Sequence, residues 1–205
     1  MIKLTIRISL QLIITVLFLV ATFSRNQIWQ NTVSLWTDVS NRPSKGRSFQ
    51  TLGQYYATHG DYEKAIVNFL EAINRAPRMP VIYYDLAHAY EDIGDLEKAI
   101  WTFKCALAAS LVADGFDTAR IHKGLGEIYF KNLELSKARG EFETVIALEP
   151  NNSNAHYKLG LIYRANEDYR ASSSQILQAI ALDPQNKLYK QQLKEIFFLE
   201  KRRGK

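Results

Sequence analysis

The sequence predicts an all-α solenoid built from paired helices, because one helix-hairpin pattern recurs four times in register. In residues 52–77, LGQYYATHGDYEKAIVNFLEAINRAP, small and large apolar residues recur at helical spacing in two halves. Between the halves, Gly60 can end one helix and Asp61 can cap the next. Pro77 then ends the second half. We therefore expect this stretch to fold as a helix hairpin.

The ends of successive units lie at a nearly constant interval. They are Pro43, Pro77, Leu111, Pro150 and Pro184, separated by 34, 34, 39 and 34 residues. The longer step is an insertion of five residues around Asp114 to Thr118, which either projects a loop or alters the stacking of two repeats. The spacing, with its Leu-Gly pair, tyrosine, alanine and phenylalanine, resembles the tetratricopeptide repeat (TPR) pattern of helix-turn-helix units. The resemblance implies a right-handed solenoid with repeats at 46–79, 80–113, 119–152 and 153–186.

Residue size predicts which side chains pack the helices together. The small residues of the first helices are Gly53, Ala87, Gly126 and Gly160, and their partners in the second helices are Ala65, Ala99, Ala138 and Ser172. Large residues are expected to fill the space between hairpins. These are Tyr56, Tyr90, Tyr129 and Tyr163 in the first helices and Phe69, Phe103, Phe142 and Ile176 in the second.

The N-terminal segment is apolar and uncharged over sixteen residues, 8–23. We interpret residues 1–25 as a single membrane-spanning anchor, which Arg7 can extend by snorkelling. A cleaved secretory signal, leaving a secreted soluble protein, is the main alternative, although Thr22 and Ser24 make a poor cleavage site. A buried first helix is a third reading. The flanking positive charges weakly favour repeats outside the cytoplasm.

Two further helices are expected to flank the repeats. Residues 26–45 read as an amphipathic half-repeat ending at Pro43, and residues 187–205 as a capping helix with a basic tail. Leu188, Leu193, Ile196, Phe197 and Leu199 are predicted to form the apolar face of that cap. The junction of an apolar span, RNQIWQNTVSLW and repeats also resembles the tail of multi-spanning glycosyltransferase-like membrane proteins. That resemblance implies topology and no catalysis.

Composition argues against several classes of function. The formal net charge is +5, yet residues 26–186 carry 16 basic and 19 acidic residues, so the basic excess lies at the two ends. A nucleic-acid partner is therefore not expected. Cys105 is the only cysteine, which excludes an internal disulfide and a thiolate zinc site.

No pattern in the sequence indicates catalysis. His122 and His156 occupy the same site in two repeats, and neither His59 nor His88 has a metal-ligand spacing. Phosphate loops, nucleophile elbows and Cys-His pairs are lacking. We therefore expect no enzyme activity, metal, cofactor or small-molecule substrate.

The expected site is a concave groove lined by first helices, where residues not needed for packing can bind a protein or peptide. The predicted groove residues are Gln50, Gln54, Tyr84, His88, Glu91, Lys123, Glu127, Phe130, Tyr157, Leu161 and Arg164. Some TPR proteins clamp a C-terminal carboxylate with lysine, asparagine and arginine, but the matching positions here hold Gln50, Gln54 and Asp85. We hypothesise a membrane-anchored adaptor or scaffold within a larger complex. An accessory or detached tail of a membrane glycosyltransferase system remains the alternative.

Overall fold

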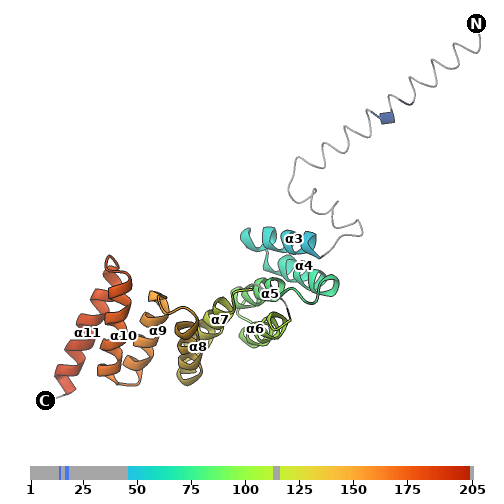
Figure 1. The fold of residues 1–205 in the computed structure, drawn as a ribbon. Helices are drawn as coiled ribbons and strands as arrows, with labels where there is room; N and C mark the ends of the chain where they lie inside the picture. The colour runs from blue at the N-terminus through green and yellow to red at the C-terminus, as the bar shows by residue number, and fades with distance from the viewer. Residues whose placement is uncertain (1–13, 15–16, 19–45, 113–115, 204–205) are drawn as a thin grey trace, which may run out of the picture. The chain divides into compact units, whose positions relative to one another are not determined.

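The computed structural model describes residues 14, 17, 18, 46–112 and 116–203, and every secondary-structure element among them beyond residue 45 is an α-helix (Figure 1). With the labels of that figure, these nine helices are α3 (Arg47–Thr58), α4 (Tyr62–Arg75), α5 (Pro80–Asp92), α6 (Leu96–Ser110), α7 (Thr118–Lys131), α8 (Leu135–Leu148), α9 (Ser153–Ala165), α10 (Tyr169–Leu182) and α11 (Lys187–Arg203). They form an all-α solenoid of helix pairs, as predicted. The chain divides into two compact units, 1–77 and 78–205.

The turns inside the helix pairs follow the aspartates and glycines of the sequence. Asp61, Asp95 and Asp168 cap α4, α6 and α10 by accepting hydrogen bonds from backbone N–H groups three residues ahead, at 3.3, 3.2 and 3.0 Å. Gly60 and Gly94 precede two of these caps with φ angles of 78° and 81°. The first four N–H groups of a helix lack partners within the helix, and these aspartates supply acceptors, so each turn both ends one helix and starts the next.

The core is built where small residues of a first helix meet large residues of the second. A Cβ atom on Gly53 would lie 2.6 Å from the ring of Phe69, and one on Gly160 would lie 2.7 Å from Cδ1 of Ile176. The predicted partners Ala65, Ala99, Ala138 and Ser172 are all fully buried. The predicted small partners are therefore core residues, but Phe69 and Ile176, both expected to fill the space between hairpins, lie against the glycine of their own pair.

The predicted tyrosines are less buried than expected. Tyr129 is buried, whereas Tyr56, Tyr90 and Tyr163 are only half-buried. A lysine of the next helix lies over three of the rings: Lys64 over Tyr56, Lys98 over Tyr90 and Lys137 over Tyr129, each 5.3 to 5.5 Å from the centroid. The half-buried rings of Tyr56 and Tyr90 thus meet a lysine at the surface, and the buried ring of Tyr129 makes the same kind of contact.

The capping helix α11 packs on the last pair through a face that includes Leu193 and Ile196, as predicted, together with Tyr189. Tyr189 and Ile196 are buried with Tyr157 and Ile176, and Leu193 packs against the same cluster. Leu188 and Phe197, both expected to face the array, are about half exposed. The prediction was wrong for these two residues, since both lie near 90° from Ile196 on the helix at 100° per residue.

The predicted anchor, 1–25, and half-repeat, 26–45, lie outside the described residues except for Ile14, Leu17 and Phe18, which are helical and exposed. In the part of the chain that the structure describes, no helix combines the length and apolar character that crossing a membrane requires. Of the insertion, the described residues show α6 ending at Ser110 and Asp117 capping α7.

Candidate functional site

Nine of the predicted groove residues lie on the first helices of the second unit, at i, i+4 and i+7 along each helix. They are Tyr84, His88 and Glu91 on α5, Lys123, Glu127 and Phe130 on α7, and Tyr157, Leu161 and Arg164 on α9. This spacing places each set of three along one side of its helix. We call the surface of α5, α7 and α9 that carries these positions the first-helix face.

The α5 end of this face is an aromatic cluster. The rings of Tyr84 and His88 meet edge to face with centroids 4.6 Å apart, and both contact Phe103 of α6, at 5.8 and 5.2 Å. Phe116, just before α7, lies 6.0 Å from Tyr84, and the Arg120 guanidinium lies 4.7 Å from the centroid of the Tyr84 ring. Tyr84 is thus half-buried and held on several sides.

Glu91 joins α5 to α7. Its Oε2 accepts a hydrogen bond from Nδ1 of His88 at 3.1 Å, and its Oε1 accepts one from Nζ of Lys131. The carboxylate side chain is only 13% exposed. The hydrogen bond from His88 and the charge of Lys131 lower the pKa of Glu91 from 4.5 to about 2. Glu91 therefore stays ionised with both oxygens engaged, and its role is to position neighbours.

Contacts between neighbouring helices continue from α7 to α11. Nζ of Lys158 on α9 lies 5.4 Å from the ring centroid of Phe130 on α7. Nη1 of Arg164 on α9 donates to Oε1 of Gln192 at 2.5 Å and to Oε2 of Glu195 at 3.2 Å, both on α11. The side chains of the face are therefore linked from helix to helix along the second unit.

Tyr157 is buried and is not an exposed residue of the first-helix face. This corrects the expectation that it is not needed for packing. It is 9% exposed and stacks on Tyr189 of α11, with ring centroids 4.7 Å apart. Burial raises the pKa of its hydroxyl. The physical reason is its position in the last repeat, where α11 covers the ring.

The two remaining predicted residues, Gln50 and Gln54, belong to α3 in the first unit. Gln50 is half-buried and Gln54 is exposed, and both take part in interactions of their own. They are therefore described apart from the first-helix face.

Sequence reasoning missed several residues of the face. Arg120 lies three residues before Lys123 and Lys131 lies four after Glu127, so helical spacing could have found both. Gln192 lies on α11 and accepts a hydrogen bond from Arg164 of α9 at 2.5 Å, and no pattern within one helix points to it.

The histidines of the third and fourth repeats hold helix pairs together. Nδ1 of His122 lies 2.7 Å from Oε2 of Glu141, and Nδ1 of His156 lies 2.8 Å from Oε1 of Gln175. Both partners stand 19 residues further on, in the second helix of the same repeat. Among the described residues, no three His, Cys, Asp or Glu side chains gather closely enough to hold a metal ion.

Comparison with family models and known proteins agrees with this architecture. Two models described as tetratricopeptide repeat match residues 51–110 and 141–172. The anaphase-promoting complex subunit CDC16 of Saccharomyces cerevisiae is 30% identical over 95 residues, which are 46% of this chain and 11% of that protein. The chain spans about a tenth of the length of the curated relatives it matches.

Solved structures show the same fold. MamA (41-end) from Desulfovibrio magneticus RS-1 superposes with a TM-score of 0.70 at 22% identity, covering 77% of this chain and 86% of that one. The first TPR of Spaghetti (RPAP3), bound to the HSP90 peptide SRMEEVD, superposes with a TM-score of 0.54 at 25% identity, covering 60% and 96%. Residues 51–110 and 141–172 therefore match tetratricopeptide repeats, and the described helices have the fold of these TPR structures.

Proposed function

We propose that the chain is a non-enzymatic scaffold that binds an extended segment of a protein partner on the first-helix face. The RPAP3 repeat in the comparison is bound to a peptide, and CDC16 is by its name a subunit of a complex. In this chain we assign the corresponding binding role to the first helices α5, α7 and α9. Both precedents support a binding role for repeats of this kind.

The observation that carries the proposal is that the face is ordered by contacts between its own side chains. Glu91 is bonded to His88 and Lys131, and Arg120 lies against Tyr84. None of these five belongs to the fully buried core. A partner would meet side chains already held in one arrangement, so binding would cost less conformational entropy.

The charges and rings of the face indicate the chemistry of the partner. Arg120 and Lys123 are exposed on α7, and Lys158 lies on α9. Of the acids predicted for the face, Glu91 is bonded to His88 and Lys131, and Glu127 interacts electrostatically with Lys131. Tyr84 and Phe130 supply half-buried rings beside these cations. This combination suits a segment with acidic and apolar side chains. The HSP90 peptide in the comparison, SRMEEVD, has that character.

We further propose that residues 1–25 hold the scaffold in a membrane, with the repeats outside the cytoplasm. This part of the proposal is supported by the uncharged run 8–23 and the distribution of basic residues alone. Binding on the first-helix face does not depend on it.

Selection of random phage-displayed peptides on the immobilised full chain tests the binding site. We expect enrichment of peptides with acidic and apolar residues. The double variant Arg120→Glu, Lys123→Glu should weaken their binding at least about tenfold, equivalent to about 1.4 kcal/mol. Both side chains are exposed, so circular dichroism should remain unchanged.

The matched control is Lys104→Glu, Arg139→Glu, which changes the net charge equally on the second helices α6 and α8. It should leave peptide affinity within about twofold, because it touches no part of the first-helix face. Equal loss in both double variants would show that binding responds to net charge, and would refute the site. Failure to enrich any peptide would refute the function.

A further inference from the structure

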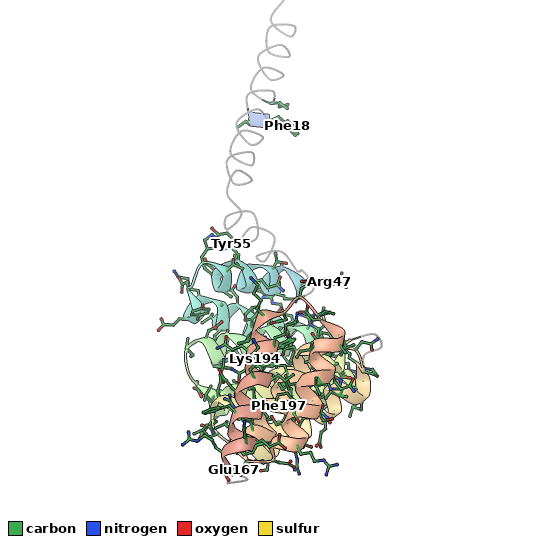
Figure 2. The ribbon with its side chains drawn as sticks, turned by 90° about the vertical axis from the view of Figure 1, so that its left-hand side faces the viewer. Phe18, Arg47, Tyr55, Glu167, Lys194 and Phe197 are labelled. Atoms are coloured by element: carbon green, nitrogen blue, oxygen red, sulfur yellow. The ribbon has the colours of Figure 1, made fainter. Side chains whose placement is uncertain are left out.

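The outward side of α11 is a strip of cations around two exposed phenylalanines. At 100° per residue, the residues that lie 100° to 180° from Ile196 around the helix include Lys187, Lys190, Lys194, Phe197, Phe198, Lys201 and Arg202, which we call the α11 strip. Phe197 is 50% and Phe198 61% exposed. Figure 2 shows α11 with Lys194 and Phe197 labelled on it. The strip combines five positive charges with an apolar centre.

The two acids of α11 border this strip and do not belong to it. They are Glu195 and Glu200. The carboxylate of Glu195 lies on the flank of the helix and accepts a hydrogen bond from Arg164 of α9, at 3.2 Å. The guanidinium of Arg202 lies 5.7 Å from the Phe198 ring centroid. Four lysines and Arg202 therefore lie around the phenylalanine pair, with Glu195 three residues from Phe198 and Glu200 three residues from Phe197.

If the outward side of α11 faced only water, capping the array would not require two exposed phenylalanines among cations. Repeat arrays hide the last hairpin behind a helix with a polar outer face. Here the inward face already supplies the packing, through Tyr189, Leu193 and Ile196. Packing does not require the two adjacent exposed phenylalanines, which have more lysines than acids around them. Contiguous exposed apolar surface rimmed by charge is typical of an interaction site.

We propose that the α11 strip contacts the anionic surface of a lipid bilayer. Each lysine near such a surface gains attraction from anionic headgroups, and its aliphatic stem can lie along the apolar boundary. Phe197 and Phe198 have no hydrogen-bonding group and enter the region between headgroups and acyl chains. A basic amphipathic helix with aromatic residues in its apolar part is the usual form of an interfacial helix.

Charge and shape favour lipid over the other anionic or apolar occupants. A second copy would bring five positive charges against five, which disfavours pairing of strip with strip. Nucleic acid binding requires cations along several elements, whereas residues 26–186 carry more acids than bases. One helix presents a convex edge to its surroundings, which fits a plane better than a peptide that needs a groove.

The two proposed surfaces are compatible and independent. Arg164 of the first-helix face contacts the flank of α11 at Glu195, to the side of the strip. A bilayer on the strip therefore leaves that flank in place. Contact with lipid would hold unit 78–205 at a membrane whether or not a peptide binds on the first-helix face.

Site-specific fluorescence on the full chain tests the proposal. The only cysteine, Cys105, is replaced by serine, and an environment-sensitive nitrobenzoxadiazole (NBD) probe is attached at Gln191→Cys beside the strip. The matched probe position is Ser136→Cys, exposed on α8, which is separated from α11 by α9 and α10. Both probes are on the same full-length chain, so any insertion of residues 1–25 affects them equally.

With phosphatidylcholine vesicles containing phosphatidylglycerol, the probe at position 191 should shift to the blue and be quenched by nitroxide-labelled lipid. The probe at 136 should do neither. Phosphatidylcholine alone should give no change at either position. The variant Lys190→Gln, Lys194→Gln, Lys201→Gln should lower the quenching at least about fivefold, the effect of about 1 kcal/mol for even one headgroup contact. Phe197→Ser with Phe198→Ser should abolish the blue shift.

Equal responses at 191 and 136, or an equal response to phosphatidylcholine alone, would overturn the proposal. A blue shift of the same size with polyglutamate and no vesicles would assign the strip to an acidic protein. A shift that grows with protein concentration without vesicles would assign it to a second copy. If circular dichroism shows that a substituted α11 has lost helicity, the comparison of the two probe positions on the unsubstituted strip decides the outcome.

Discussion

At the residue scale, Glu91 is the side chain that does most to fix the candidate site. It is the acceptor for His88 on its own helix and for Lys131 on the next first helix. A carboxylate with two cationic or hydrogen-bonding partners is stabilised in its charged form, which is why its pKa falls to about 2. A side chain that is only 13% exposed benefits more from such partners than a surface ion pair does.

This pKa shift predicts a pH-dependent contribution to stability. Because the folded-state pKa lies below the usual 4.5, the stabilisation is complete above about pH 4.5 and is lost as the pH falls toward 2. Glu91→Gln should therefore lower the free energy of unfolding by about 1 to 2 kcal/mol at pH 7, with a loss of half or less at pH 3. Urea unfolding at the two pH values measures the difference.

Glu143→Gln is the matched control for that measurement. Glu143 also pairs with a cation, Arg139, but at 3.6 Å and with both side chains about half exposed. Its loss should cost less than about 0.5 kcal/mol at either pH. A Glu91→Gln effect that is the same size as the control, or that does not shrink at low pH, would contradict the role given to Glu91.

Tyr84 and Tyr157 show how far the sequence predicts the candidate site. They hold the same position in the second and fourth repeats, and the sequence gives no reason to separate them. In the structure Tyr84 stays half-buried beside Arg120, whereas Tyr157 is covered by Tyr189. The repeat pattern predicts which helix side a residue occupies, but what lies against that side depends on the neighbouring element, which a single repeat does not encode.

At the element scale, the sequence indicates some of the turns between paired helices and does not indicate others. The glycines and aspartates of the first two repeats indicate their turns, and Gly60 and Gly94 do adopt positive φ. The corresponding positions of the third and fourth repeats hold Leu133 and Glu167, with φ angles of 60° and 59°. The backbone needs the same left-handed residue in each turn, so two turns carry a Cβ where it is disfavoured. Without a glycine there, the sequence could not reveal this.

Replacement of Leu133 by glycine should stabilise the protein. The left-handed conformation of a residue with a Cβ costs about 1 to 2 kcal/mol, part of which is offset by the greater freedom of glycine in the unfolded chain. Leu133 is 80% exposed, so little burial is lost with its side chain. We expect Leu133→Gly to raise the free energy of unfolding by about 0.5 to 1 kcal/mol in urea titrations.

Leu133→Ala separates the backbone effect from the loss of the side chain. Alanine keeps the Cβ and so keeps the strained conformation, and it should give no increase in stability. If the glycine and alanine variants unfold at the same urea concentration, the positive φ is not a source of strain in this turn.

At the scale of the whole chain, charge and apolarity are distributed unevenly along the sequence. The basic excess lies in residues 1–25 and 187–205, on either side of repeats with more acids than bases. Five of the seven basic residues at the C-terminal end belong to the α11 strip, and the predicted anchor carries the three basic residues at the N-terminal end. The repeats predicted the helix pairs and the buried alanine, serine and phenylalanine positions, because both depend on local spacing and size, whereas the burial of the tyrosines differs from the expectation. The roles of residues 1–25 and of the α11 strip depend on what surrounds the protein, and the spacing of residues in the sequence carries no information about that.

The two proposed membrane contacts differ in strength, which makes the anchor testable apart from the strip. Contact through cations and two phenylalanines is reversible and weakened by salt, whereas a spanning helix resists extraction. Full-length protein should therefore stay in the membrane pellet after high salt and alkaline carbonate, and a chain without residues 1–25 should be released. Leu17→Arg, which keeps the length of the predicted span, should impair insertion because an arginine at mid-span costs about 2.5 to 3.5 kcal/mol.

N-terminal sequencing of the pelleted protein should find the uncleaved N-terminus. A chain that begins after residue 20, or a truncated chain that stays in the pellet, would refute the anchor and leave the α11 strip to be judged on its own.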